Sequence, residues 1–305
     1  MDVDCAIIGG GPAGLNAALV LGRARRSVLL FDDNQPRNAV THESHGFLTR
    51  DGIAPSEFRR LAHEELGKYS SVALRRARVT DVRRLQDGEE SGFDLDADDG
   101  AMAQARTIIL ATGLRESLPA IPSIRDYYGK SLFSCPYCDG WELRDKPLVV
   151  IAEDGQRAFH LAKIVWNWSH DLLLCTNGHA VLSAEQKAVL RRSGIQVVED
   201  AITALDGRDG MLERVVFASH EEIAREGGFV VSALSQASGF GAQLGCELNA
   251  QGNMVIDELG RTTVPGVYAA GDAAGMAPAQ LVIAAAAGSR AAAAVNTDLT
   301  EIAFR

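Results

Sequence analysis

The sequence is poor in the features that mark secreted, membrane-spanning and nucleic-acid-binding proteins. Its five cysteines in 305 residues are too few and too scattered for a disulfide framework. It has no run of about 18 apolar residues to span a bilayer, and its start lacks the basic and apolar regions of a signal peptide. Its 30 basic and 40 acidic residues give a net charge of −10, which is unsuited to a nucleic-acid backbone. We therefore expect a cytoplasmic protein that binds neither membrane nor nucleic acid.

The composition is that of a folded protein of about two domains, with more glycine than usual. Hydrophobic residues make up 47% of the chain and charged residues 23%, which excludes a disordered chain. The 30 glycines suit a protein with many close backbone approaches, as nucleotide-binding loops require. Strand-like and helical segments alternate, so the sequence predicts an α/β fold with parallel sheets. A change of composition at residues 119–122 favours a linker there.

The predicted elements follow from apolar runs, helical periodicity and the breaks between them. Strands are expected at residues 3–8, 27–31, 72–85, 92–98, 105–111, 148–152, 172–175, 195–198, 215–218, 229–234 and 267–270. Helices are expected at residues 13–21, 55–66, 156–168, 183–192 and 281–296. Residues 34–51 predict a long loop, and residues 87–90 an acidic turn.

A glycine-rich motif follows the first predicted strand and opens the first predicted helix. Gly9, Gly11 and Gly14 have the spacing GxGxxG, and Asp32 ends the next strand. Glycines there allow a tight turn, a close pyrophosphate and close helix–strand packing, while the helix start offers N–H groups to phosphate. An acidic residue at the second strand end can accept the ribose hydroxyls. The motif predicts a dinucleotide site; the alternative is a glycine-rich turn in an unrelated α/β protein.

Two cysteines lie three positions apart in the middle of the chain, as Cys135-Pro-Tyr-Cys138, and Asp139 follows directly. Such a pair forms a small-loop disulfide or contributes two metal ligands. Zinc would need a second pair, but the other three cysteines are single residues in apolar runs, so we favour redox chemistry and expect no metal. Asp139 can exchange a proton with sulfur, or it caps a turn.

Small residues end two other predicted strands. Ala111, Thr112 and Gly113 close one of them, and Gly271 and Asp272 close the other. Such strand ends allow close packing against a bound cofactor, and an aspartate can hydrogen-bond its ribityl or phosphate part. Each signal is weak when taken alone.

Taken in order, these motifs resemble the low-molecular-weight thioredoxin reductases over essentially the whole chain. The resemblance implies FAD, a homodimer, and two Rossmann-like domains, the second inserted into the first: residues 1–117 and 237–305 for FAD, and 118–236 for the inserted domain of NADPH type. It implies that Cys138 faces the flavin, that Cys135 exchanges with the partner thiol, and that Asp139 is the acid or base. The residues implied or predicted to bind FAD are Gly9, Gly11, Pro12, Ala13, Gly14, Asp32, Asn38, His45, Ala111, Thr112, Gly113, Gly271, Asp272, Gln280 and Leu281.

The inserted domain departs from that family where its own nucleotide motif should be. After the predicted strand at 148–152 the chain reads Glu153-Asp154-Gly155, with one glycine and two carboxylates that would repel phosphate. After the next strand, residues 175–179 lack the clustered basic residues that hold a 2′-phosphate. We therefore expect NADPH to bind poorly, and place the chain in a subgroup with a degenerate NADPH motif.

Several electron donors and partners stay open at this level. The chain is similar to flavoproteins that take electrons from ferredoxin or another donor and pass them to a thioredoxin-like or small-molecule disulfide. Arg37, Asn38, His42, the pair His45-Gly46 and residues 135–142 also resemble the dithiol-oxidase branch, which passes electrons to oxygen. That branch often has a histidine after its second cysteine, where this chain has Asp139. His45 either assists proton transfer near the flavin or makes a local hydrogen bond. An ordinary NADPH-dependent reductase and a non-enzymatic redox sensor are the remaining alternatives.

Overall fold

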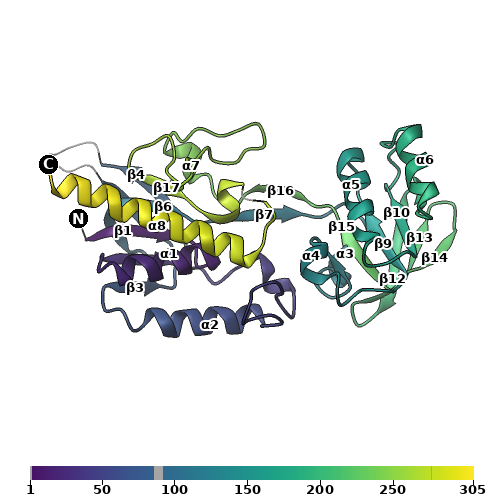
Figure 1. Cartoon of the computed structure of the whole chain (residues 1–305), viewed down its shortest axis with the longest axis horizontal. Helices are drawn as coiled ribbons and strands as arrows, with labels where there is room; N and C mark the ends of the chain where they lie inside the picture. The colour runs from purple at the N-terminus through teal and green to yellow at the C-terminus, as the bar shows by residue number, and fades with distance from the viewer. Residues whose placement is uncertain (1, 86–91, 276) are drawn as a thin grey trace. The chain divides into compact units, whose positions relative to one another are not determined.

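The computed structural model describes residues 2–85, 92–275 and 277–305, so the predicted acidic turn at 87–90 lies outside the described residues. The chain divides into two compact units (Figure 1). Unit 1 comprises residues 1–39, 46–115 and 235–305, and unit 2 comprises residues 40–45 and 116–234. Most of unit 2 is therefore one long insertion into unit 1, and a short second segment precedes it in the chain.

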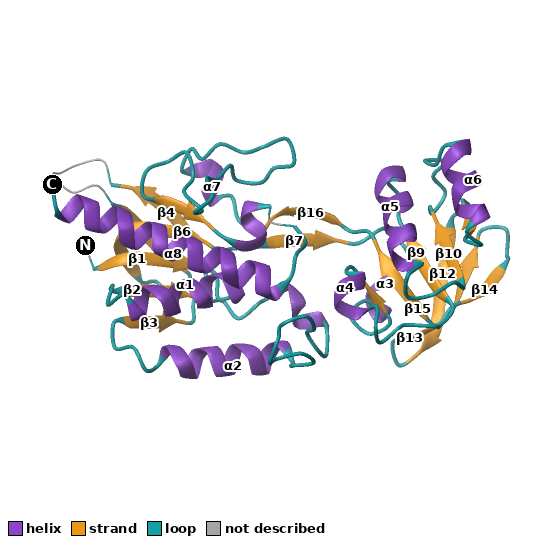
Figure 2. Ribbon diagram, viewed as in Figure 1, coloured by secondary structure: helices purple, strands orange, loops and turns teal. Residues whose placement is uncertain are grey.

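The sheet of unit 1 is mixed, with a parallel part and an antiparallel part (Figure 2). Its strands are β1 (Val3–Ile8), β2 (Val28–Phe31), β3 (Val72–Arg75), β4 (Val79–Arg84), β5 (Phe93–Ala97), β6 (Met102–Leu110) and β17 (Val267–Ala269). Strands β3, β2, β1, β6 and β17 pair in parallel, whereas β4 and β5 extend the sheet from β6 in antiparallel pairs.

The single strand predicted at residues 72–85 is wrong, because the chain turns between residues 75 and 79. The two pieces become β3 and β4 at opposite ends of the sheet. Both pieces contain β-branched residues at strand-like spacing, so composition alone did not show that they pair with different neighbours.

Three long helices accompany this sheet: α1 (Pro12–Arg23), α2 (Pro55–Leu66) and α8 (Leu281–Ala303). A Cβ atom on Gly288 would overlap the carbonyl oxygen of Ala13, so glycine permits α8 to cross α1 at close range. Helix α8 continues past the predicted end at residue 296. There the Arg26 guanidinium donates to Asn296 and to the Thr300 hydroxyl, at 2.8 Å each, and Leu299 is buried in the core.

Unit 2 contains a five-stranded parallel sheet and a three-stranded antiparallel one. The parallel strands are β8 (Leu132–Phe133), β9 (Leu148–Ile151), β10 (Leu172–Cys175), β11 (Gln196–Val198) and β15 (Gly227–Val230). The antiparallel strands are β12 (Ile202–Arg208), β13 (Met211–Phe217) and β14 (Glu222–Ala224). Its helices are α3 (Ile124–Tyr127), α4 (Pro136–Asp139), α5 (Gly155–Val165) and α6 (Ala184–Arg192). The predicted α/β class is confirmed, although the antiparallel sheet, with β12, was missed.

The remaining elements are short. Strand β7 (Leu114–Ser117) pairs with β16 (Ala233–Gln236), so the strand predicted at 229–234 is in fact divided between β15 and β16. Helix α7 (Phe240–Gln243) and the 3₁₀ turns η1 (Arg37–Val40) and η2 (Gly271–Ala274) belong to the loops. No helix within the described ranges combines the length and the apolar character needed to cross a bilayer.

Candidate active site

The predicted FAD-binding residues gather at one edge of the sheet in unit 1. The turn 9–14 follows β1, Asp32 follows β2, residues 111–113 follow β6, and Gly271 and Asp272 follow β17. These strands are parallel neighbours, so their carboxyl ends lie along the same edge. Ligands of open α/β sheets bind outside the carboxyl ends of the strands. The edge therefore collects residues that the sequence separates by more than 250 positions.

The glycine turn has the geometry that a pyrophosphate needs. Gly9 has a φ of +116°, and a Cβ atom there would overlap the carbonyl oxygen of Ala111. A Cβ atom on Gly14 would overlap the carbonyl oxygen of Gly9, so the turn is packed tightly on its inner side. At Gly11, by contrast, a Cβ atom would meet nothing within 4 Å, and no side chain caps the start of α1. The open side and the uncapped helix start fit a dinucleotide.

Asp32, which is predicted to accept the ribose hydroxyls, is buried and fixed by contacts within the protein. Its side chain is buried, with 3% exposed, and a Cβ atom on Gly10 would overlap it. One carboxylate oxygen accepts the N–H of Asn34 at 2.9 Å, and the other accepts the guanidinium of Arg59 in α2. Arg59 was missed because an arginine in an amphipathic helix carries no signal that it points inward. The pair fixes the carboxylate at the strand end, where each oxygen retains a lone pair for a further donor.

Asp272 also has a cationic partner in the structure. Its carboxylate binds the Arg37 guanidinium at 2.8 Å, and both side chains are partly exposed. Arg37 opens η1, and Asn38 is the next residue. Gly271 lies beside Ala13, since a Cβ atom on it would be 3.0 Å from that side chain. The β17 end, η1 and the glycine turn thus contribute to the same edge.

The start of α8 completes the set of predicted FAD-binding residues in unit 1. Gln280 is the N-cap of α8, without a side-chain hydrogen bond to the helix, and Leu281 is its first residue. At the end of β6, the hydroxyls of Thr112 and Ser238 lie 3.2 Å apart, and the carbonyl of Gly113 accepts the N–H of Ala237. Of the predicted set only His45 lies in unit 2.

The three predicted catalytic residues lie on a single turn in unit 2. Cys135 is the N-cap of α4, and its carbonyl accepts the N–H groups of Cys138 and Asp139 at 3.1 and 3.2 Å. Both cysteines are partly exposed. The other three, Cys5, Cys175 and Cys246, are buried in the core, as predicted, and burial raises the pKa of each thiol. Only the Cys135–Cys138 pair is therefore accessible to a thiol partner.

Helix α4 packs against the ring of Trp168. A Cβ atom on Gly140 would overlap the carbonyl oxygen of Pro136 and lie 2.9 Å from the ring of Trp168. Tyr137 meets the same ring edge to face, with centroids 5.6 Å apart. Glycine after Asp139 is thus required for the close contact that holds the thiol turn in place.

Asp139 is in an environment that favours its protonated form. Burial, together with the negative charges of Cys135 and Glu142, raises the pKa of Asp139 from 3.8 to about 7, and the charge of His45 opposes this rise. A carboxyl group with a pKa near neutrality can both give and take a proton at physiological pH. A pKa raised in this way is what an acid–base role for Asp139 would require.

In the nucleotide loop of unit 2, the first turn of α5 is covered by the chain itself. The Asp154 carboxylate accepts the N–H of Arg157 at 2.8 Å and so caps the helix that should face a phosphate. A Cβ atom on Gly155 would overlap the carbonyl oxygen of Val181, so the backbone of the loop before α6 lies directly against this glycine.

Side-chain contacts also tie together the ends of β9 and β10. The Asn177 amide donates to the Glu153 carboxylate at 2.7 Å and accepts the N–H of Ile202 at 2.9 Å. The imidazole of His179 lies 4.0 Å from the same carboxylate. The place where a second dinucleotide would be expected holds internal hydrogen bonds and carboxylates.

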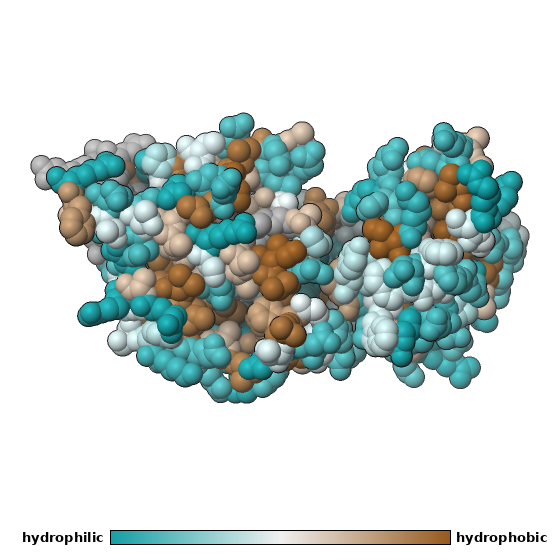
Figure 3. Space-filling model, viewed as in Figure 1, coloured by the Kyte–Doolittle hydropathy of each residue, from teal (hydrophilic) through white to brown (hydrophobic). Residues whose placement is uncertain are grey.

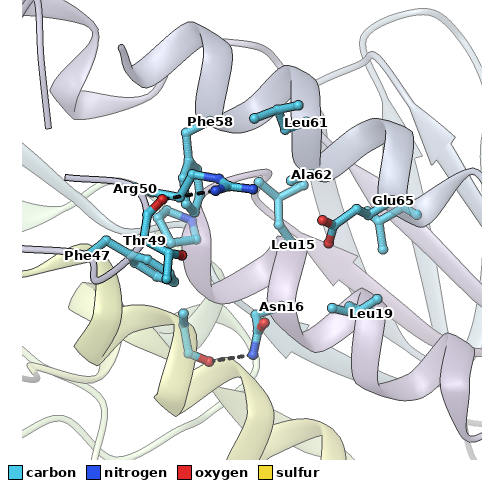
Figure 4. Close-up of a pocket in the computed structure, with 13 residues that line it drawn as sticks. Leu15, Asn16, Leu19, Phe47, Thr49, Arg50, Phe58, Leu61, Ala62 and Glu65 are labelled. Atoms are coloured by element: carbon cyan, nitrogen blue, oxygen red, sulfur yellow. Dashed lines mark hydrogen bonds between the residues drawn. The ribbon is translucent and has the colours of Figure 1, made fainter. Parts of the chain in front are cut away.

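A groove of about 230 Å³ lies in unit 1, between α1, α2 and the loop at residues 47–50, and Pro12 of the predicted FAD-binding set lines it (Figure 4). Phe47 and Phe58 meet edge to face across it at 5.5 Å. Hydrophobic side chains also gather on the visible face of this unit between α8 and α2 (Figure 3). Within the described ranges no three His, Cys, Asp or Glu side chains are grouped as a metal site.

Residues 3–288 match the family model for pyridine nucleotide-disulphide oxidoreductases. The chain is 33% identical to the thioredoxin reductase aclD of Aspergillus oryzae, over 97% of this chain and 96% of the relative. It is 30% identical to a probable thioredoxin reductase of Arthroderma benhamiae, over 98% of this chain and 80% of the relative. Its structure resembles that of a putative thioredoxin reductase TrxB from Bacillus anthracis, with a TM-score of 0.94 and 46% identity, over 99% of this chain and all of that one.

Proposed function

This chain belongs to the pyridine nucleotide-disulphide oxidoreductase family and is a flavin oxidoreductase of thioredoxin reductase type, and on that premise we propose how it moves electrons. Two electrons pass between FAD and a thioredoxin-like or small-molecule disulfide through Cys135 and Cys138. The observation that carries this proposal is the α4 turn, which places two accessible cysteines and a carboxyl group with a pKa near 7 on one helical turn.

The residues of the chain divide the exchange into two steps. The Cys135 thiolate attacks the substrate disulfide and forms a mixed disulfide, and the departing sulfur takes a proton from Asp139. The Cys138 thiolate then attacks Cys135, which releases the second substrate thiol and leaves a Cys135–Cys138 disulfide. One substrate disulfide is reduced to two thiols, and one dithiol of the protein is oxidised. FAD, when bound, would be the two-electron carrier that reduces the Cys135–Cys138 disulfide back to the dithiol.

The residues proposed to hold FAD are those at the carboxyl edge of the sheet in unit 1. The glycine turn and the start of α1 would receive the pyrophosphate, Asp32 the adenosine ribose, and Asp272 the ribityl or phosphate part. The open space beside Gly11 supports this assignment. The remaining contacts are proposed for Asn38, for the strand end at 111–113, and for Gln280 and Leu281.

We propose that the electron donor is not NADPH. A pyrophosphate at α5 would have to displace the Asp154 carboxylate and the Val181 backbone from the helix start. It would also face Glu153, which is held in place by Asn177. A charge-assisted hydrogen bond contributes about 1.5–3 kcal/mol, so replacing two of them with repulsion weakens binding by several orders of magnitude. Ferredoxin or another small donor fits such a protein, and a homodimer is the expected assembly.

The test is an anaerobic titration of the flavin in the purified holoprotein. NADPH, NADH, reduced ferredoxin and dithiothreitol are compared as reductants, and bleaching of the flavin band is followed. We expect dithiothreitol to reduce the flavin through Cys135 and Cys138 in the wild type and not in Cys135→Ser, and NADPH to act slowly or not at all. Micromolar affinity for NADPH with rapid bleaching would instead make the chain an ordinary NADPH-dependent reductase.

The second candidate function is a dithiol oxidase, in which electrons flow in the opposite direction, from a substrate dithiol through the same cysteines to the flavin and then to oxygen. The covered α5 start favours it equally, because that cycle needs no pyridine nucleotide. Aerobic incubation with a dithiol distinguishes the two. Stoichiometric hydrogen peroxide at turnover rates supports the oxidase, whereas fast reduction by ferredoxin with little peroxide supports the reductase.

A further inference from the structure

The segment at residues 40–45 departs from unit 1 and packs within unit 2. The backbone of Val40 lies against Gly129, where a Cβ atom would overlap the Val40 carbonyl oxygen. Gly129 has a φ of +83°, so glycine is required there for both its conformation and this contact. The contact delivers the end of the segment, His45, to the unit that carries the thiol turn.

His45 is held between two carboxylates. Its Nε2 lies 3.6 Å from the Glu43 carboxylate, in the same segment, and 3.8 Å from that of Glu142, just after α4. The His45 side chain is only 16% exposed, while both glutamates are considerably more exposed. A mostly buried ring with a carboxylate nearby on each of two elements is held in one place.

The charge on His45 acts on Asp139. The groups that face Asp139 are Cys135 at the start of α4, Glu142 after its end, and His45 from the 40–45 segment. Cys135 and Glu142 oppose ionisation of the Asp139 carboxyl, and His45 is the one group of the three that favours it. An imidazolium there offsets the two negative charges on either side of Asp139 in the sequence.

We propose that His45 is a positioning residue for thiol–disulfide exchange, held by Glu43 and Glu142 so that its positive charge governs the proton that Asp139 gives to sulfur. The inference rests on the proposed function in one respect, that Asp139 is the acid of the exchange. The two carboxylates that carry the inference, Glu43 and Glu142, lie with His45 in unit 2.

The first measurement follows Asp139 directly and needs no turnover. Infrared difference spectra between wild type and Asp139→Asn, recorded across pH, give the titration of the Asp139 carboxyl. In His45→Gln, which removes the positive charge, we expect this titration to move to higher pH by roughly one unit. In Glu142→Gln, which removes a negative charge and retains a polar group beside His45, we expect it to move to lower pH. His170→Gln is the control, since that ring packs at a tilt against Trp166 in the same unit.

The second measurement is the pH dependence of Cys135 reaction with an alkyl disulfide, read as mixed disulfide by rapid quench and mass spectrometry. In His45→Gln the pH profile of the Cys135 reaction should move to higher pH than in wild type. In the double variant, the profile should coincide with that of Asp139→Asn alone. The inference would be overturned if Asp139 titrated at the same pH in wild type and in His45→Gln. It would also be overturned if His45→Gln moved the Cys135 pH profile as far in the Asp139→Asn background as in the wild-type background. A wild type whose Cys135 fails to react would instead refute the proposed function, and the infrared titration would still decide the role of His45.

Discussion

Replacing Asp139 with asparagine should stabilise unit 2 at alkaline pH while it slows the chemistry. Burial, the Cys135 charge and Glu142 raise the pKa of Asp139 to about 7, above its ordinary value of 3.8. A carboxyl group whose folded pKa is raised contributes stability that is complete below about pH 4 and is lost as the pH rises through 7. Asparagine keeps the shape of the side chain and removes the ionisation, so the variant avoids that loss.

The size of the effect follows from the same pKa. A difference of about three pH units corresponds to about 4 kcal/mol between the protonation states, since each unit is worth about 1.36 kcal/mol. Because the side chain is partly exposed, this figure is an upper bound. For a domain of this size each kcal/mol moves the midpoint of thermal unfolding by about 3–5 °C. We therefore expect Asp139→Asn to melt up to about 20 °C above wild type at pH 8.5, and at the same temperature as wild type at pH 4.

The assay uses the natural placement of tryptophan. All three tryptophans, Trp141, Trp166 and Trp168, lie in unit 2, so intrinsic fluorescence reports the unfolding of that unit. Thermal scans of wild type and Asp139→Asn from pH 4 to pH 8.5 give the difference as a function of pH, with the exposed Asp126→Asn as control. A constant difference across this range, or a variant less stable than wild type at pH 8.5, would refute the electrostatic reasoning. Turnover of the variant should fall by about 10²–10⁴-fold.

Three further outcomes test the cofactor edge and the thiol turn. Gly11→Glu should abolish FAD binding, because a carboxylate would fill the open side of the glycine turn, and a yellow variant would remove this edge from the FAD site. Cys135→Ser and Cys138→Ser should each lose disulfide turnover and keep FAD, and Cys138→Ser should trap a thiol partner through Cys135; turnover in both variants would place the chemistry elsewhere. Gly140→Ala should displace α4 from Trp168, destabilise unit 2 by about 1–3 kcal/mol and shift the tryptophan emission, and an unchanged spectrum would contradict that packing.

The parts of the molecule that sequence patterns predicted best are those in which local chemistry determines local structure. The glycine turn between β1 and α1 is one case, because only glycine accepts the φ of Gly9 and the contact at Gly14. The thiol turn is another, since the spacing of Cys135 and Cys138 already confines both to one turn of helix. The helix α2 matches its predicted bounds, because proline opens it and its apolar stripe is regular.

The parts that were missed depend on contacts between distant segments. The sequence did not reveal that Arg59 reaches Asp32, because an inward-pointing arginine looks the same in sequence as an exposed one. Residues 72–85 read as one strand because the pattern of apolar residues does not show which neighbour each piece pairs with. Nothing in the residues around His45 shows that the segment before Gly46 packs in unit 2.

The discontinuous make-up of unit 2 limits how it can be separated from the rest of the chain. The chain passes between the units at 39/40, 45/46, 115/116 and 234/235, so cutting only at β7 and β16 isolates residues 116–234 and leaves the 40–45 segment behind. The excised fragment would retain both cysteines and lose the segment that packs against Gly129. A chimaera that exchanges this unit between flavoproteins must therefore transfer two separate segments, 40–45 and 116–234. An exchange at β7 and β16 alone would combine the thiol turn of one protein with the 40–45 segment of the other.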